Sequence, residues 1–241
     1  MIPLRDANPT RRTPWVTLVL IAINVALFFL WEPITGTPRE QARFFFCHGA
    51  IPEEMIDLQP IPEVAAACGG KNVLQSLFTS MFLHGGFLHI AGNMLYLWVF
   101  GNNVEDRMGR SVFLLFYLAA GLVAAYAQAL PNPASQVPLI GASGAIAGTL
   151  GAYIVMFPHA RVLTLLPIFF FLQLTELSAW LVLGFWFVLQ AFQGVGSLGG
   201  EIAGVAWWAH IGGFVFGAIV ALLFYRRRAA PVSPYDPYDP Y

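Results

Sequence analysis

The apolar residues of this chain fall in long unbroken runs, not in the alternating or amphipathic patterns of a soluble core. Of its 241 residues, 58% are hydrophobic and only 10% are charged. Such runs are typical of helices that cross a bilayer, since about 20 apolar residues span its hydrocarbon layer. The runs lie at residues 15–31, 87–100, 112–130, 140–157, 177–192 and 205–225. We therefore predict an all-α membrane protein with six transmembrane helices.

The positions of arginine and lysine predict how these helices are oriented. Six spans place both termini on one side of the membrane. With both termini in the cytoplasm, only three of the 12 Lys and Arg residues lie on the outer side: Arg39, Arg43 and Lys71. Because cytoplasmic segments carry the excess of positive charge, we expect this orientation, in the inner (cytoplasmic) membrane of a cell. The net charge of −1 provides no basic field for nucleic acid.

The segment 162–175 is apolar but is not counted as a seventh span. It has about fourteen residues and contains Pro167, which is short for a crossing and disfavours a continuous helix. We expect an interfacial or partly re-entrant piece that leads into the fifth helix.

Composition divides the chain into three parts. Residues 1–14 form a polar, cytoplasmic N-terminal lead, residues 15–225 form one membrane domain, and residues 226–241 form a basic and then Tyr-Asp-Pro-rich cytoplasmic tail. Both ends are expected to be disordered because they cannot bury a core. Within the domain, a large outer loop of residues 32–81 joins the first two helices. Short amphipathic helices on the membrane surface are expected there.

Both cysteines, Cys47 and Cys68, lie in this outer loop. The oxidising side of a membrane permits a disulfide, but two unpaired cysteines fit the sequence equally well. A metal site that adds His48 lacks a fourth ligand at a familiar spacing, so no metal or other cofactor is predicted.

Small residues recur every four positions in the fourth and sixth predicted helices. They are Gly144, Gly148 and Ala152 in one, and Ala209, Gly213 and Gly217 in the other. Such spacing lets helix backbones approach closely in lipid. We expect these two helices to touch.

Polar side chains inside the apolar runs are few, and they are costly in a bilayer unless they face protein or a water-filled cavity. They are Asn24, His89, Asn93, Ser143, Thr149, Gln190 and His210. Under the predicted topology, the second, fourth and sixth helices enter from the outer side. With a rise of about 1.5 Å per residue, the polar groups of these helices near that side lie roughly 5 to 10 Å deep. Those groups are His89, Asn93, Ser143 and His210.

These four residues have the chemistry of a serine hydrolase. Ser143 needs a base to take its proton, and His210 is the candidate on a helix expected to pack against it. No aspartate lies in any span, so a Ser-His dyad is favoured over a triad. The helix start at Ser143, with the side chains of Asn93 and His89, could stabilise an oxyanion. Gly141 and Gly144 would leave room for substrate.

Each residue also has a simpler interpretation. A serine between glycines is often a packing residue, and a buried Asn or Gln often joins helices. A transporter or channel could use His89, Asn93 and His210 as a polar path. A transporter, however, predicts polar residues through the full depth and often an internal repeat, whereas here they gather at one depth without a convincing repeat.

Three motifs resemble those of the rhomboid intramembrane serine proteases. They are His89-Ile-Ala-Gly-Asn93, Gly141-Ala-Ser-Gly144, and the nine-residue stretch from Ala209 to Gly217, AHIGGFVFG. The stretch EDRMG at 105–109 is also similar, and the resemblance covers about residues 15–225. It implies a rhomboid-like six-helix bundle that cleaves membrane-protein substrates within the lipid bilayer.

The resemblance implies that Ser143 is the nucleophile, His210 the general base, and Asn93, His89 and the Ser143 N–H the oxyanion site. It also implies that the glycine-rich segment 194–204 is a mobile cap beside a lateral gate formed by the fifth helix. Some relatives carry an aromatic residue one turn after the serine that stacks on the histidine. Here that position is Ala147, so what orients His210 is open. An inactive relative that acts as a membrane-protein chaperone is the alternative within the family.

Overall fold

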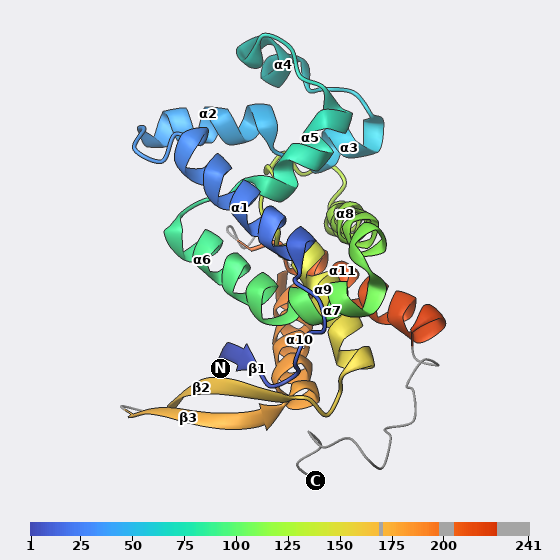
Figure 1. The fold of residues 1–241 in the computed structure, drawn as a ribbon. Helices are drawn as coiled ribbons and strands as arrows, with labels where there is room; N and C mark the ends of the chain where they lie inside the picture. Colours follow the sequence, from blue (N-terminus) through green and yellow to red (C-terminus); the bar gives the residue numbers. More distant parts are fainter. Residues whose placement is uncertain (169–170, 198–204, 226–241) are drawn as a thin grey trace, which may run out of the picture.

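The computed structural model describes residues 1–168, 171–197 and 205–225. This part of the chain is mostly helical, with one small sheet below the helices in Figure 1. The expectation of an all-α fold is therefore wrong for the sheet. The tail 226–241 and most of the glycine-rich segment 194–204 lie outside the described residues.

Each predicted apolar run lies largely in helical structure. The helices are α1 (Trp15–Leu30), α6 (Phe87–Tyr96) with its continuations η2 (Leu97–Gly101) and α7 (Asn102–Met108), α8 (Arg110–Ala129), α9 (Ser143–Met156), α10 (Ala179–Gly196) and α11 (Trp207–Phe224). In the described residues, three helices are long and apolar enough to cross a bilayer, namely α8, α10 and α11. Helices α1 and α9 are apolar but shorter. The count of six spans remains a prediction.

Helices α9 and α11 pack backbone against backbone, as the spacing of small residues predicts. A Cβ atom added to Gly217 would collide with the carbonyl oxygen of Gly148, and one added to Gly213 would collide with that of Gly144. We call this contact the glycine seam. It fixes the separation of α9 and α11 because no side chain lies between their backbones at these points.

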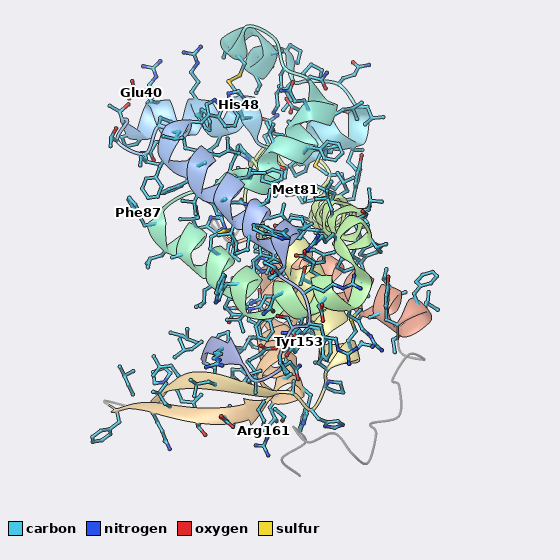
Figure 2. All side chains as sticks on the ribbon, viewed as in Figure 1. Glu40, His48, Met81, Phe87, Tyr153 and Arg161 are labelled. Carbon is cyan, nitrogen blue, oxygen red and sulfur yellow. A yellow bond between two sulfur atoms is a disulfide. The ribbon has the colours of Figure 1, made fainter. Side chains whose placement is uncertain are left out.

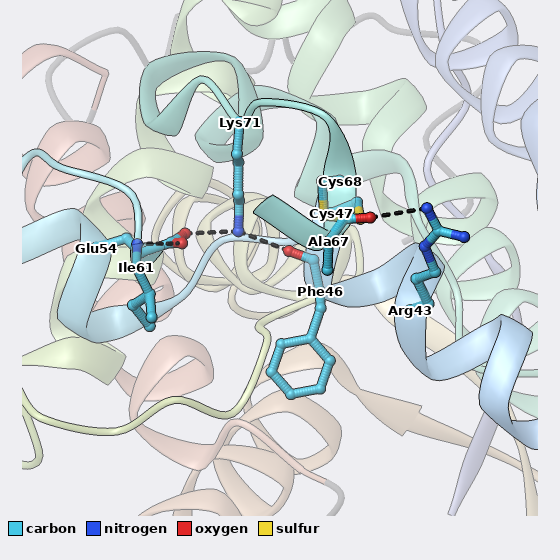
Figure 3. Close-up of a disulfide and its surroundings, with 8 residues drawn as sticks. All are labelled: Arg43, Phe46, Cys47, Glu54, Ile61, Ala67, Cys68 and Lys71. Carbon is cyan, nitrogen blue, oxygen red and sulfur yellow. Dashed lines mark hydrogen bonds and ion pairs between the residues drawn. A yellow bond between two sulfur atoms is a disulfide. The ribbon is translucent and has the colours of Figure 1, made fainter. Parts of the chain in front are cut away.

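The predicted outer loop contains four short helices: α2 (Pro38–His48), α3 (Pro52–Asp57), α4 (Pro62–Cys68) and α5 (Val73–Thr79), followed by the turn η1 (Ser80–Phe82). A disulfide between Cys47 and Cys68 joins α2 to α4 (Figure 3). Beside it, Lys71 pairs with the buried carboxylate of Glu54 and donates a hydrogen bond of 2.7 Å to the carbonyl of Phe46. The sequence left open whether the two cysteines are paired, and the structure pairs them in a disulfide.

Two antiparallel strands within residues 161–178 lead directly into α10, a secondary structure that the sequence did not predict. The interfacial or partly re-entrant placement of this segment stays a prediction. The strands are β2 (Arg161–Ile168) and β3 (Phe171–Ser178). Valine and threonine favour a strand here. Pro167 is tolerated because β1 (Ile2–Asp6) pairs with β2 only as far as Leu165, which leaves that edge of β2 unpaired at the proline.

The N-terminal lead is not wholly disordered, because β1 completes the sheet in the order β1-β2-β3. The Asp6 carboxylate then ties this sheet to the helices. It accepts hydrogen bonds of 2.6 Å from the Tyr153 hydroxyl and 2.6 Å from the Asn103 amide. Tyr153 lies between the helices and the sheet in Figure 2. The sheet therefore anchors the end of α9 that lies far from Ser143.

Candidate active site

Ser143 and His210 meet at one end of the glycine seam. Ser143 is the first residue of α9, and His210 lies in the first turn of α11. The serine Oγ is 2.9 Å from the histidine Nε2, a hydrogen-bond distance. Ser143 and His210, 67 positions apart in the sequence, are thus in direct contact because the backbones of α9 and α11 approach closely.

The segment before Ser143 is fixed by backbone hydrogen bonds to the predicted outer loop of residues 32–81. Leu139 and Ala50 exchange two such bonds, and the N–H of Gly141 donates to the carbonyl of Ser80 at 2.8 Å. Gly141 has φ +121°, which strongly favours glycine. A Cβ at this position would also lie 2.8 Å from His89 Nε2. The backbone before the serine is therefore held against the His89 ring.

The other ring nitrogen of His210 contacts α10. His210 Nδ1 lies 2.6 Å from Gln190 Oε1, and the centre of the Trp186 ring lies 5.8 Å from that of the imidazole. Trp207 contributes an edge-on contact at 6.2 Å. Ala147 is fully buried in the core and offers no ring. Side chains of α10, together with Trp207, thus surround the imidazole.

Sequence reasoning identified Gln190 as polar but gave it no role in the site. Its isolation in an apolar run was the available signal. Whether Gln190 lies level with His210 depends on how far α10 is shifted along α11, and the sequence does not specify that shift.

His89 lies beside the serine loop from the α6 side. Its Nδ1 accepts a hydrogen bond of 3.3 Å from the N–H of Gly85. In the neutral ring this leaves the proton on Nε2, the nitrogen that faces Gly141. His89 therefore presents an N–H donor next to the serine loop.

Asn93 follows His89 by four residues, so the two side chains lie on the same face of α6. It is buried, and its amide nitrogen has no hydrogen-bond partner among the described residues. A buried donor without an acceptor is costly in a folded protein. An acceptor that comes from a bound molecule would remove this cost.

The remaining predicted polar residues and Gly144 have local roles. Thr149 and Asn24 each donate to the backbone carbonyl four residues earlier in their own helix. Gly144 allows close packing of α9 on α8, since a Cβ there would lie 2.6 Å from that of Ala124. The described residues include no group of three or more His, Cys, Asp or Glu side chains that could hold a metal ion.

Comparison with known proteins identifies the family that this chain matches. The family model described as Rhomboid domain matches residues 71–227. Rhomboid protease GluP of Bacillus subtilis (strain 168) is 32% identical over 193 residues, which cover 79% of this chain and 34% of GluP.

Two mitochondrial proteins are similar as well. The human presenilin-associated rhomboid-like protein is 28% identical over 203 residues, which cover 80% of this chain and 47% of that protein. Rhomboid protein 1 of Saccharomyces cerevisiae (strain ATCC 204508 / S288c) is 32% identical over 143 residues, or 56% of this chain and 41% of the yeast protein. The chain thus spans between a third and a half of the length of these three relatives.

Proposed function

Since the chain belongs to the rhomboid family, we propose that it is an intramembrane serine endopeptidase with a Ser143-His210 dyad. The observation that carries this proposal is the 2.9 Å contact between Ser143 Oγ and His210 Nε2. Nucleophile and base within hydrogen-bond reach, with a third group on the base, are typical of activated serine nucleophiles. The name of GluP, which contains the word protease, supports the same activity.

In the proposed reaction, His210 Nε2 takes the hydroxyl proton as Ser143 Oγ attacks the carbonyl carbon of the scissile peptide. The resulting oxyanion would be stabilised by the N–H of Ser143, the Asn93 amide and the His89 Nε2–H. The free Asn93 amide nitrogen supports this role. His210 then gives its proton to the leaving amine, and water attacks the acyl-enzyme by the reverse sequence of proton transfers.

The proposed substrates are membrane proteins whose transmembrane segments contain weak helix formers near their outer end. A peptide bond within a helix is hydrogen-bonded and shielded, so a segment with Gly or Pro reaches the extended form more easily. We also propose that both termini lie in the cytoplasm and that the site opens to the extracytoplasmic side. The distribution of Lys and Arg supports this orientation.

The test uses purified protein in detergent and a single-span substrate with Gly and Pro near its outer end. The wild-type protein should cleave it with or without chelators, and Ser143→Ala and His210→Ala should each abolish cleavage. Ser76→Ala is the matched control, because it removes a buried hydroxyl that bonds only within α5. Cleavage that persists in Ser143→Ala would refute the dyad. Wild-type protein that binds the substrate without cleaving it would favour the chaperone alternative.

A further inference from the structure

The imidazole of His210 is held through both of its nitrogens by two different helices. Nε2 contacts Ser143 on α9 at 2.9 Å, and Nδ1 contacts Gln190 on α10 at 2.6 Å. A ring flip would break both contacts at once. The orientation of the base thus depends on α10 as well as on the helix that carries the nucleophile.

The Gln190 oxygen selects one tautomer of His210. An amide oxygen is only an acceptor, so the proton of the neutral imidazole must lie on Nδ1. Nε2 then has the lone pair that accepts the serine proton. With the amide reversed, its NH₂ group would face Nδ1, and the ring proton would move to the nitrogen that must act as the base.

The carboxamide also differs from a carboxylate in charge. Gln190 can orient the ring and accept its proton, but it carries no negative charge to offset the imidazolium that forms during the reaction. A carboxylate at the same position would favour the protonated ring. This difference gives Gln190 a measurable signature that a residue of merely structural importance would lack.

Helix α10 contributes these contacts through side chains. Gln190 is buried, and Trp186 lies one turn before it, beside the same imidazole. The opposite side of α10 exposes large apolar residues, including Phe185 and Phe192. We infer that Gln190 is a positioning residue that sets the tautomer and orientation of His210, so that the dyad is complete only while α10 is docked on α11. This inference rests on the proposed function.

The experiment compares Gln190→Leu and Gln190→Glu with the same substitutions at Gln193, an exposed residue of the same helix. The rate at which a fluorophosphonate probe labels Ser143 is measured across pH, together with the melting temperature. Gln190→Leu should slow labelling about 10- to 100-fold, because the tautomer is no longer selected. In Gln190→Glu, the acid limb of the pH profile should move to higher pH. Both Gln193 variants should follow the wild type.

A second measurement does not depend on catalysis. The ¹⁵N ring shifts of His210, assigned by comparison with His210→Ala, should show a proton on Nδ1 in the wild type and mixed tautomers in Gln190→Leu. If Gln190→Leu does not fold, the test is the shift in the pH profile of the nearly isosteric Gln190→Glu.

The outcomes separate the two proposals. Wild-type protein that neither cleaves nor reacts with the probe would contradict the proposed function. Wild-type protein that reacts, with Gln190 variants that match their Gln193 controls in rate, pH profile and ring shifts, would overturn the inference alone.

Discussion

Helix α11 meets α9 and α10 in two different ways. Against α9 the contact is the glycine seam, where backbone touches backbone. Against α10 the contact is made by side chains, such as the stacked rings of Phe187 and Phe214, whose centres are 4.5 Å apart. A backbone contact cannot be adjusted by a change of rotamer, whereas a side-chain contact can. The distance from Ser143 to His210 is thus rigidly set, while the orientation of His210 depends on a more adaptable interface.

The burial of α9 and of α10 agrees with this difference between a rigid and an adaptable contact. Every residue of α9 from Gly144 to Tyr153 is buried, so the helix has no free face over that length. Helix α10 is buried at only a few positions along one side. Movement of α10 would therefore disturb fewer packed contacts than movement of α9.

The largest expected effect comes from a methyl group placed in the glycine seam. Gly217→Ala would put a Cβ into the Gly148 carbonyl, so the helices must separate, at a cost of at least about 2 kcal/mol. We expect a large fall in melting temperature and loss of probe labelling at Ser143. The control is Gly184→Ala on α10, where an added Cβ meets nothing within 4 Å and stability should change by less than about 1 kcal/mol. Equal tolerance of both changes would contradict the rigid seam.

A smaller effect is expected from the α10 interface. Phe187→Ala removes the ring stacked on Phe214, which weakens the docking of α10 by about 1 kcal/mol. Labelling of Ser143 should slow by up to about tenfold, with little change in the melting temperature. Phe185→Ala, an exposed ring two residues earlier, is the matched control and should label at the wild-type rate. A Phe187 variant that unfolds before it loses labelling would show that α10 is as essential to the fold as the seam.

The smallest effect concerns the far end of α9, where Asp6 bonds to Tyr153. Burial raises the pKa of the Asp6 carboxyl to about 6 from its ordinary 3.8, although the Tyr153 hydroxyl and Arg5 oppose the shift. The folded state therefore holds this proton more tightly than the unfolded state, and stability should fall as pH rises from about 4 to about 6. A decrease of roughly 2 to 5 °C in melting temperature is expected over this window.

Asp6→Asn provides the comparison, because its side chain does not titrate, so the fall in melting temperature between about pH 4 and about pH 6 should become smaller. A melting temperature that rises through the same window, or an identical slope in the variant, would contradict the assignment. Labelling of Ser143 should change little, since the seam lies between Asp6 and the site.

The sequence was sufficient for the features that depend on local composition. Long apolar runs predicted the helices, the four-residue spacing of glycines predicted the α9–α11 contact, and the motifs placed Ser143 beside His210. These signals work because each is a property of one segment or of a repeated spacing. The contact between Nε2 and Oγ then follows from the close packing of the two helices.

Features that join distant segments were not predictable in the same way. The partner of His210 depends on the rotation and offset of α10, which apolar periodicity leaves undetermined. The hairpin was missed because an apolar run of strand length resembles a short helix. Strand β1 was missed because its partner β2 lies about 160 residues away, where composition near the N-terminus gives no sign of it.

The connection between the sheet and α10 has a practical consequence. Strand β3 ends at Ser178 and α10 begins at Ala179 without a linker, and the N–H of Ala179 donates to the carbonyl of Ala160 at the base of the hairpin. A load on β1 passes through β2 and β3 to the first turn of α10, the helix that touches the His210 imidazole. Affinity handles and fluorescent fusions attached ahead of Ile2 would therefore pull on β1 and, through the sheet, on α10.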